Sequence, residues 1–292
     1  MQRLLILLRL SRPINIVFAA LTYVLGAGIA RYLGVLQNVI VFWLGLGGIM
    51  LAQFSMDLLA EALRPVDQPS GNNENRAERV NLRKAALMVS ISALAAAGAI
   101  AILLVQEGIS PVVMIFMSLS LATVLAYAVP PLRLVDAGFG EFTLAVHIAV
   151  IATALGFVLQ TGEYHRVVAI VSFPLTMLAL AYFLILDFPT FLNDEKYDRR
   201  TLLRSMGWER AVPLHHGLVL GAYLLLGSAT FFGLAWGLIW PSLLTLPFAI
   251  FQIIQLRNIS LGVKPVWNLL TVNAIAVFGL TAYLLTFAFW LR

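Results

Sequence analysis

The 292-residue chain is 61% hydrophobic and only 11% charged, with a mean hydropathy of +0.93, which excludes an ordinary soluble domain and indicates a helical membrane protein. Cysteine is absent, so disulfides, thiol nucleophiles and thiolate metal sites are excluded. A net charge of +5 could suggest nucleic acid, but in a membrane protein it is more simply a sign of topology, and we expect no nucleic-acid partner.

Long apolar runs divide the chain into nine expected membrane spans. Each is close to the length of about 20 residues that a helix needs to cross a bilayer. The spans cover 14–33, 38–58, 86–106, 110–128, 142–160, 166–187, 214–234, 238–256 and 267–290. Because backbone polar groups must be satisfied inside lipid, the spans should be helical, and the sequence predicts an all-α polytopic membrane protein.

Basic residues predict how the spans are oriented. With the N-terminus in the cytoplasm, as the early Arg3 and Arg9 favour, all but three of the 19 lysines and arginines fall on the cytoplasmic side. The exceptions are Arg31, Arg166 and Arg292. The C-terminus would then lie outside. The long polar connections, 59–85 and 188–213, would share the cytoplasmic side, where we expect the chemistry to occur.

A first polar group ends the second span. Gln53, Asp57 and Glu61 are separated by steps of four, which places them on one helical stripe. A plainer interpretation is a solvated helix end in which Glu61 pairs with Arg64. The stripe by itself does not decide between a binding site and this local ion pair.

A second acidic group begins at the end of the sixth span. Asp187, Thr190, Asp194 and Asp198 fall at steps of three, four and four, which would bring them to nearly one face of a continuing helix. Acids at the mouth of an apolar helix are costly unless a cation accompanies them. Two such stripes on one side of the membrane would suit Mg²⁺ between them, and neighbouring arginine and lysine side chains would suit a diphosphate.

Three further polar positions stand out. Pro130 and Pro131 end the fourth span and fix a turn that would aim Arg133 at a defined place, although Arg133 could equally be a positive-inside anchor. Asn15 lies inside the first span near Arg12, where a polar residue is functional more often than in a soluble helix, and it could face a pocket. His147 lies inside the fifth span, and we expect a hydrogen-bonded packing histidine there rather than a base.

Together these motifs resemble the UbiA superfamily of intramembrane prenyltransferases, which has nine spans and two aspartate-rich motifs after spans two and six. The family's first motif, N-D-x-x-D-x-x-x-D, corresponds here to Gln53, Phe54, Asp57 and Glu61. In the branch that acts on dihydroxynaphthoate and related acceptors, as in menaquinone synthesis, the second motif often reads F-P-D-x-x-x-D and is followed by Lys/Arg-Thr-Leu and a glycine. It is matched by Phe188, Pro189, Thr190, Asp194, Arg200, Thr201, Leu202 and Gly207. The Y-x-x-P-P-x-R-L signature of that branch is matched by Tyr127, Pro130, Pro131, Arg133 and Leu134, and the Arg-Pro before the first span by Arg12 and Pro13.

The chain also departs from the family pattern. Gln53 replaces an asparagine, Phe54 an aspartate, and Glu61 an aspartate or glycine, while Thr190 replaces the leading aspartate of the second motif. Asp187, one turn earlier, could supply that missing carboxylate. The number of metal ions is therefore left open.

The resemblance implies a single prenyltransferase domain over 1–292. Its reaction would be the Mg²⁺-dependent transfer of a prenyl group from a polyprenyl diphosphate to a lipid-soluble aromatic acceptor resembling a quinone precursor. It implies that the catalytic residues are Asp57, Asp187, Asp194 and Arg133, and that the Mg²⁺ ligands are Asp57, Glu61, Asp187 and Asp194. It implies that the substrates are bound by Gln53, Glu61, Arg133, Lys196, Arg200, Asn15 and Tyr127.

Two other functions are compatible with the same residues. A terpene cyclase of this family would ionise the diphosphate without an acceptor. A cation-coupled transporter would use the acids for a coupling ion, but these acids lie at span ends and not at the midplane of broken helices. In each case we expect a multi-pass protein of the cell membrane, in contact with lipid, with its site facing the cytoplasm.

Overall fold

The computed structural model describes residues 7–8, 10–35, 38–65, 67–68 and 76–292 of the chain. Within this part, nine helical segments are long and apolar enough to cross a membrane. The predicted all-α architecture with nine spans is therefore confirmed. The side on which the N-terminus lies stays a prediction, and two of the residues that support it, Arg3 and Arg9, lie outside the described residues.

The elements follow one another in this order: α2 (Pro13–Tyr32), α3 (Val39–Ala62), α4 (Arg76–Gln106), α5 (Pro111–Ala128), η1 (Leu134–Asp136), α6 (Gly140–Val146), η2 (His147–Ile151), α7 (Ala152–Thr161), α8 (Arg166–Asp187), α9 (Phe191–Lys196), α10 (Leu202–Met206), α11 (Trp208–Ser228), η3 (Ala229–Phe232), α12 (Trp236–Ile239), η4 (Trp240–Thr245), α13 (Leu246–Ser260) and α14 (Trp267–Trp290). The fifth span is thus one continuous helical rod, α6–η2–α7, with a π-turn in its middle.

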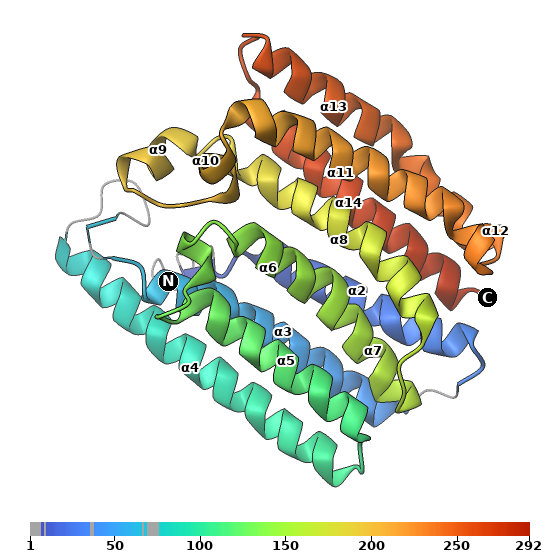
Figure 1. The fold of residues 1–292 in the computed structure, drawn as a ribbon. Helices are drawn as coiled ribbons and strands as arrows, with labels where there is room; N and C mark the ends of the chain where they lie inside the picture. Colours follow the sequence, from blue (N-terminus) through green and yellow to red (C-terminus); the bar gives the residue numbers. More distant parts are fainter. Residues whose placement is uncertain (1–6, 9, 36–37, 66, 69–75) are drawn as a thin grey trace.

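The long helices form one bundle (Figure 1). The helices α3, α4 and α5 lie on one side and α8, α11, α13 and α14 on the other, with α2 and the α6–η2–α7 rod between them. The short helices α9 and α10 lie at the same end of the bundle as the start of α4. Burial follows this arrangement. In the central rod, 83% of the 18-residue apolar stretch is buried, whereas only 17% of the corresponding stretch in α4 is buried.

Glycines allow the two central helices to touch. A Cβ added to Gly26 on α2 would overlap the carbonyl oxygen of Thr153, and one added to Gly156 on α7 would overlap that of Tyr23. Small residues at such a crossing let two backbones approach closely, which is how helices pack in lipid, where hydrophobic burial offers little drive. The last helix, α14, is hydrogen-bonded to α2 near this crossing, because the Trp290 indole N–H donates to the Val24 carbonyl at 2.9 Å.

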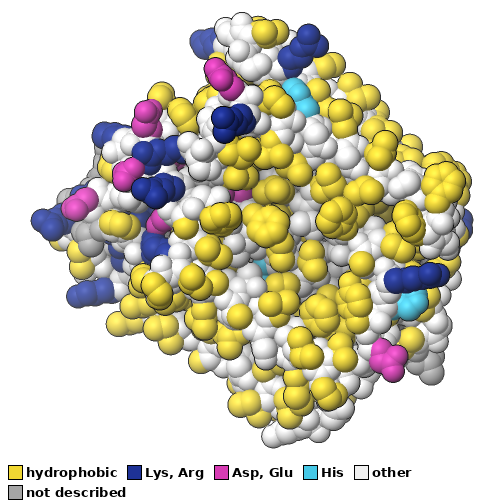
Figure 2. All heavy atoms as spheres, viewed as in Figure 1, with side chains coloured by type: hydrophobic (Ala, Val, Ile, Leu, Met, Phe, Trp, Pro, Cys, Tyr) yellow, Lys and Arg dark blue, Asp and Glu magenta, His cyan; other side chains and the backbone are white. Residues whose placement is uncertain are grey.

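The surface matches a membrane setting. Acidic and basic side chains gather at the end that carries α9 and α10, whereas the face over the long helices is mainly hydrophobic (Figure 2). Large apolar side chains are exposed on the long helices, among them Met88, Leu224 and Val272. A contiguous apolar surface of this kind is unusual on a soluble monomer and is expected where lipid covers the protein.

The polar connections contain more helix than expected. The connection predicted at 59–85 is helical at both ends, because α3 runs on to Ala62 and α4 begins at Arg76. The connection predicted at 188–213 contains α9, α10 and the first turns of α11. The predicted eighth span is interrupted, since α12, η4 and α13 share it.

The predicted single acidic face from Asp187 to Asp198 is wrong. The helix α8 ends at Asp187, the chain turns, and α9 starts afresh at Phe191. Asp198 follows α9 in a left-handed conformation with φ of 52° and points to solvent, where it pairs with Arg204 at 2.7 Å. The even spacing of these acids had indicated one helix, but the turn at 188–190 breaks the helical period.

Candidate functional site

A cavity of about 360 Å³ lies where several long helices end. The start of α2, the end of α5, the start of α6 and the end of α8 meet there, and α14 closes one side. Its polar lining consists of Arg12, Asn15, Glu141, Asp187, Thr190, Arg199 and Thr271. Its apolar lining includes Leu144, Phe183, Leu186 and Ile275, and two tyrosines, Tyr127 and Tyr182, contribute aromatic rings. A polar mouth over an apolar body is the usual form of a ligand pocket.

Arg12 supplies positive charge at the start of α2. It is the residue before the helix and adopts a left-handed conformation with φ of 45°, which a non-glycine residue seldom holds and which often marks functional sites. Burial alone would lower the pKa of Arg12. Electrostatic interactions with the neighbouring Tyr127, Asp57 and Glu61 together raise the pKa by more than burial lowers it, so the net pKa lies above the ordinary value. The guanidinium is therefore a permanent charge.

The first polar group is held by two amides. The Nδ2 of Asn15 lies 3.3 Å from both carboxylate oxygens of Asp57, and the Nε2 of Gln53 donates to Asp57 Oδ2 at 2.9 Å. All three side chains are buried. Asn15 also lines the cavity, and its Oδ1 is buried without a hydrogen-bond partner. Asp57 itself does not line the cavity, but it contacts Asn15, which does.

Two acidic side chains, Asp187 and Glu141, line the cavity. Asp187 at the end of α8 lies within electrostatic range of Glu141 on α6 and of Arg199. Both carboxyl groups are buried, and Asp187 Oδ2 has no hydrogen-bond partner. Glu141 is anchored because its Oε2 accepts from the backbone N–H of Leu202 at 3.2 Å. Two adjacent buried carboxylates repel each other unless a cation lies beside them.

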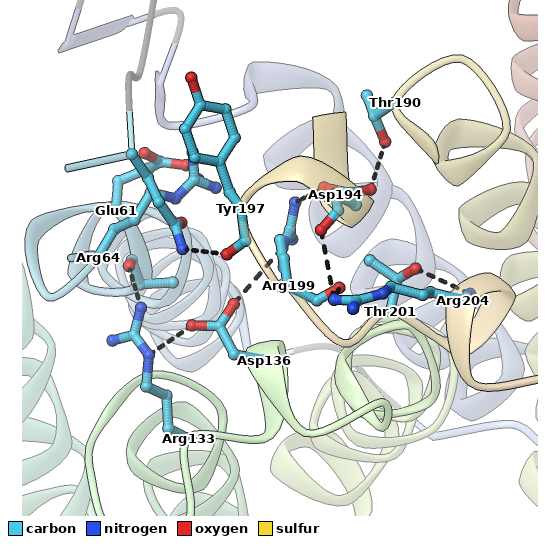
Figure 3. A network of polar contacts seen from close by, with 12 residues as sticks. Glu61, Arg64, Arg133, Asp136, Thr190, Asp194, Tyr197, Arg199, Thr201 and Arg204 are labelled. Atoms are coloured by element: carbon cyan, nitrogen blue, oxygen red, sulfur yellow. Dashed lines mark hydrogen bonds and ion pairs between the residues drawn. The ribbon is translucent and has the colours of Figure 1, made fainter. Parts of the chain in front are cut away.

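Arg199 joins this pair to a network of ion pairs (Figure 3). Its Nη1 lies 3.5 Å from Asp194 Oδ1 and its Nε lies 3.5 Å from Asp136 Oδ1. Asp136 also accepts from Arg133 Nε at 2.6 Å, and Thr190 Oγ1 donates to Asp194 Oδ2 at 2.8 Å. The predicted residues Arg133 and Asp194 therefore reach the cavity through Arg199 and do not line it themselves.

The remaining predicted residues lie further out. Glu61 pairs with Arg64 at 2.7 Å, as the plainer interpretation of that helix end had it. Lys196 and Arg200 are exposed and do not line the cavity. Of the residues proposed from sequence, Asn15, Tyr127 and Asp187 line the cavity directly.

Sequence reasoning missed several site residues. Arg199 stands next to the position that matches the family motif, and the choice between Arg199 and Arg200 depends on the turn after α9. Glu141 was passed over because it opens an apolar span, although an acid beside a membrane helix is a signal that could have found it. Tyr182 resembled an ordinary core aromatic, and Asp136 an ordinary loop acid.

The oxygen atoms are consistent with a divalent cation held jointly with a ligand. Among the residues that the structure describes, no group of three or more histidine, cysteine or acidic side chains is close enough to hold an ion alone. Mg²⁺ is commonly bound by one or two carboxylates, with waters and substrate phosphates completing its shell. The unpartnered oxygens of Asp187 and Asn15 and the adjacent Glu141 fit that kind of site.

Comparison with known proteins gives structural relatives only. No family model and no curated protein matches the sequence. A UbiA homologue from Archaeoglobus fulgidus, solved with GPP and Mg²⁺ bound, aligns over 98% of this chain and 100% of its own with a TM-score of 0.68 and 18% identity. The same homologue bound to DMAPP and Mg²⁺ aligns over 96% and 98% with a TM-score of 0.61 and 18% identity. A structure described for digeranylgeranylglyceryl phosphate synthase in membranes aligns over 100% and 98% with a TM-score of 0.61 and 14% identity. Over essentially its whole length, this chain therefore has the fold of the UbiA homologues.

Proposed function

We propose that the protein is a Mg²⁺-dependent membrane prenyltransferase, which moves a prenyl group from a polyprenyl diphosphate to a lipid-soluble aromatic acceptor resembling a quinone precursor. The observation that carries the proposal is the composition of the cavity. Two arginines and two unpartnered oxygens lie at its mouth, and apolar and aromatic side chains line its body. A donor with a hydrocarbon tail and an anionic head needs both parts. The fold-level relatives that were solved with GPP or DMAPP and Mg²⁺ support the same assignment.

The anionic head belongs at the mouth of the cavity. Arg12 and Arg199 present planar guanidinium groups, which bind phosphate oxygens in pairs. Arg133 contributes indirectly, because it fixes Asp136, which in turn orients Arg199. The exposed Lys196 and Arg200 add positive charge outside the mouth and attract the donor without contacting it.

The proposed Mg²⁺ ligands are four carboxylates, of which Asp187 lines the cavity and the other three lie outside its wall. Asp57 and Glu61 belong to α3, while Asp187 and Asp194 belong to the end of α8 and to α9. Bound Mg²⁺ would supply Lewis-acid stabilisation of the leaving diphosphate. The carboxylates would hold the ion near the donor head, where the bond between the allylic carbon and oxygen would break.

The body of the cavity suits the reacting carbon atoms. Leu144, Phe183 and Ile275 exclude water, so that the allylic cation is not quenched to an alcohol. The ring faces of Tyr127 and Tyr182 can stabilise this cation by cation–π attraction. The electron-rich acceptor then forms the new carbon–carbon bond and loses one proton to the diphosphate or to a carboxylate.

A dihydroxynaphthoate-like molecule is the acceptor that the sequence favours. Tyr127, Pro130, Pro131 and Arg133 match the signature of that branch. Asn15 Oδ1 is an unpartnered acceptor on the cavity wall and could receive a hydrogen bond from an acceptor hydroxyl. The orientation with the mouth on the cytoplasmic side is part of the same proposal, since the basic residues favour it.

The test is an assay of the purified full chain in lipid nanodiscs. Polyprenyl diphosphates of several chain lengths are supplied with Mg²⁺ and a panel of quinone precursors, and both diphosphate release and prenylated product are measured. Equal amounts of both products, abolished by EDTA, are expected. Diphosphate release without an acceptor product would instead indicate a terpene cyclase. The absence of diphosphate release with every donor would reject both enzyme functions and favour a transporter.

A further inference from the structure

A continuous chain of buried hydrogen bonds crosses four helices behind the cavity. It begins with Asn15 and Asp57, and passes through Gln53 Nε2, which donates to Asp57 at 2.9 Å. The Oε1 of Gln53 lies 2.9 Å from His147 Nδ1, and His147 Nε2 lies 3.0 Å from Ser120 Oγ. His147 and Gln53 are fully buried, and His147 does not touch the cavity. Neither the proposed reaction nor simple packing explains a polar chain at this place.

The order of donors along the chain is fixed by one group. An ionised carboxylate can only accept, so Asp57 requires the NH₂ of Gln53 on its side. The Gln53 carbonyl oxygen then faces His147 and requires a donor, which is N–H at Nδ1. With its proton on Nδ1, a neutral ring has a bare Nε2, which accepts from the Ser120 hydroxyl.

The backbone at His147 is built for this contact. The π-turn η2 begins at His147 and rotates the side chains of the rod relative to a regular α-helix. Thr22 on α2 donates from Oγ1 to the carbonyl oxygen of Ile148 at 2.6 Å and so satisfies a backbone group inside the π-turn. π-Turns are rare and are found mostly at functional positions. The hydrogen bond from α2 therefore stabilises the backbone turn from which the imidazole contacts Gln53.

We propose that His147 is a positioning residue that acts through Gln53 on the Asp57 carboxylate, one of the proposed Mg²⁺ ligands. Gln53 donates to Oδ2, Asn15 Nδ2 lies 3.3 Å from both carboxylate oxygens, and His147 prevents the Gln53 amide from rotating by 180°, an orientation that would set its carbonyl oxygen against Asp57. This role rests on the proposed function for what Asp57 binds. Outer partners of this kind orient the ligand groups of metal sites.

The first test needs no turnover. The full chain, with all four of its histidines labelled with ¹⁵N, is studied in nanodiscs at pH 8, where a histidine of ordinary pKa is neutral. The His147 signals are identified by their loss in His147→Leu. We expect a neutral ring protonated at Nδ1, which changes to Nε2 protonation in Gln53→Leu. A ring protonated at Nε2 in the unaltered chain, or one indifferent to Gln53→Leu, overturns the proposal.

The second test uses two substitutions that keep different ends of the ring. Asparagine at position 147 places an amide nitrogen near the site of Nδ1, whereas glutamine reaches only the site of Nε2. His147→Asn should keep the Mg²⁺ concentration for half-maximal turnover near that of the unaltered chain. His147→Gln should raise it by about 10- to 100-fold, the usual effect of losing an outer partner. Equal behaviour of the two variants contradicts the proposal.

A double substitution and a control complete the design. Because His147 acts through Gln53, His147→Leu should have no further effect on the Mg²⁺ response in a Gln53→Leu background. Ser120→Ala removes the other partner of the ring, so it should lower the thermal midpoint without changing the Mg²⁺ response. A purely structural histidine would instead make His147→Leu and Ser120→Ala alike. If the unaltered chain turns over no diphosphate, the proposed function fails, while the ¹⁵N result still decides the role of His147.

Discussion

Arg199 and Arg200 are adjacent arginines with opposite surroundings, and exchanging each for glutamine tests the site directly. Arg199 lines the cavity and its side chain is only 15% exposed, whereas Arg200 is exposed and outside the cavity. Both substitutions remove one positive charge from the same turn. They therefore have the same long-range effect on an anionic donor, and a difference between them reports local contact.

The expected magnitude follows from the contacts that Arg199 can make. A hydrogen bond to a charged group contributes about 1.5–3 kcal/mol when water is largely excluded. Since about 1.4 kcal/mol corresponds to a factor of ten, Arg199→Gln should lower kcat/KM for the donor by about 10- to 150-fold. Arg200→Gln should lower it less than about threefold, the range of a screened surface charge.

The assay is diphosphate release in nanodiscs over a range of donor concentrations, at 50 and 200 mM salt. The loss in Arg199→Gln should persist at the higher salt, because contact with a buried group is little screened. Thermal midpoints are measured alongside, since Asp136 and Asp194 each lose an ion-pair partner. Equal losses in the two variants, or a loss in Arg199→Gln that vanishes with salt, would refute the placement of the donor head at Arg199.

Three further predictions concern the acids and the helix crossing. Asp187→Asn should reduce Mg²⁺-dependent turnover by about 100-fold or more, while the thermal midpoint stays equal or rises because repulsion by Glu141 is relieved; a fall in both would show a structural role. Gly156→Ala should lower the free energy of unfolding by about 1–3 kcal/mol, because its Cβ overlaps the α2 backbone, whereas Gly98→Ala, in open space on α4, should raise it by up to about 1 kcal/mol. Denaturation in detergent micelles measures both, and a matching loss in the two variants contradicts the crossing. The hydrogen bond from Arg204 lowers the pKa of Asp198, so its small stabilising effect is complete above about pH 4 and is lost only as the pH falls further; Asp198→Asn should leave turnover at pH 7 unchanged, and a pH-dependent loss of turnover near neutrality would contradict this assignment.

Much of the fold could be predicted because it depends on local physics. Nine apolar runs of bilayer length must form helices, since lipid offers no hydrogen bonds to the backbone. Contacts between residues four apart on one helix were equally predictable. Gln53 and Asp57 do share a hydrogen bond along α3, and the expected hydrogen-bonded environment of His147 is confirmed.

Local spacing failed where the chain turns. The steps from Asp187 to Asp198 fit one helix, yet the backbone breaks after Asp187 and sends Asp198 into solvent. The turn after α9 then orients the next residues, so that Arg199 lines the cavity and Arg200 is exposed outside it. The spacing of charged residues does not reveal which of two adjacent side chains faces the cavity.

The sequence by itself determined the nine helices of bilayer length that the described part of the chain forms, and the two acidic groups at the ends of two of them, because hydropathy and helical spacing are properties of neighbouring residues. Only the tertiary structure decided that Asn15 meets Asp57 across 42 positions, that Glu141 faces Asp187, and that a π-turn aims His147 at Gln53. Those meetings depend on how helices cross, which is set by glycine contacts and by backbone turns distributed over the whole chain.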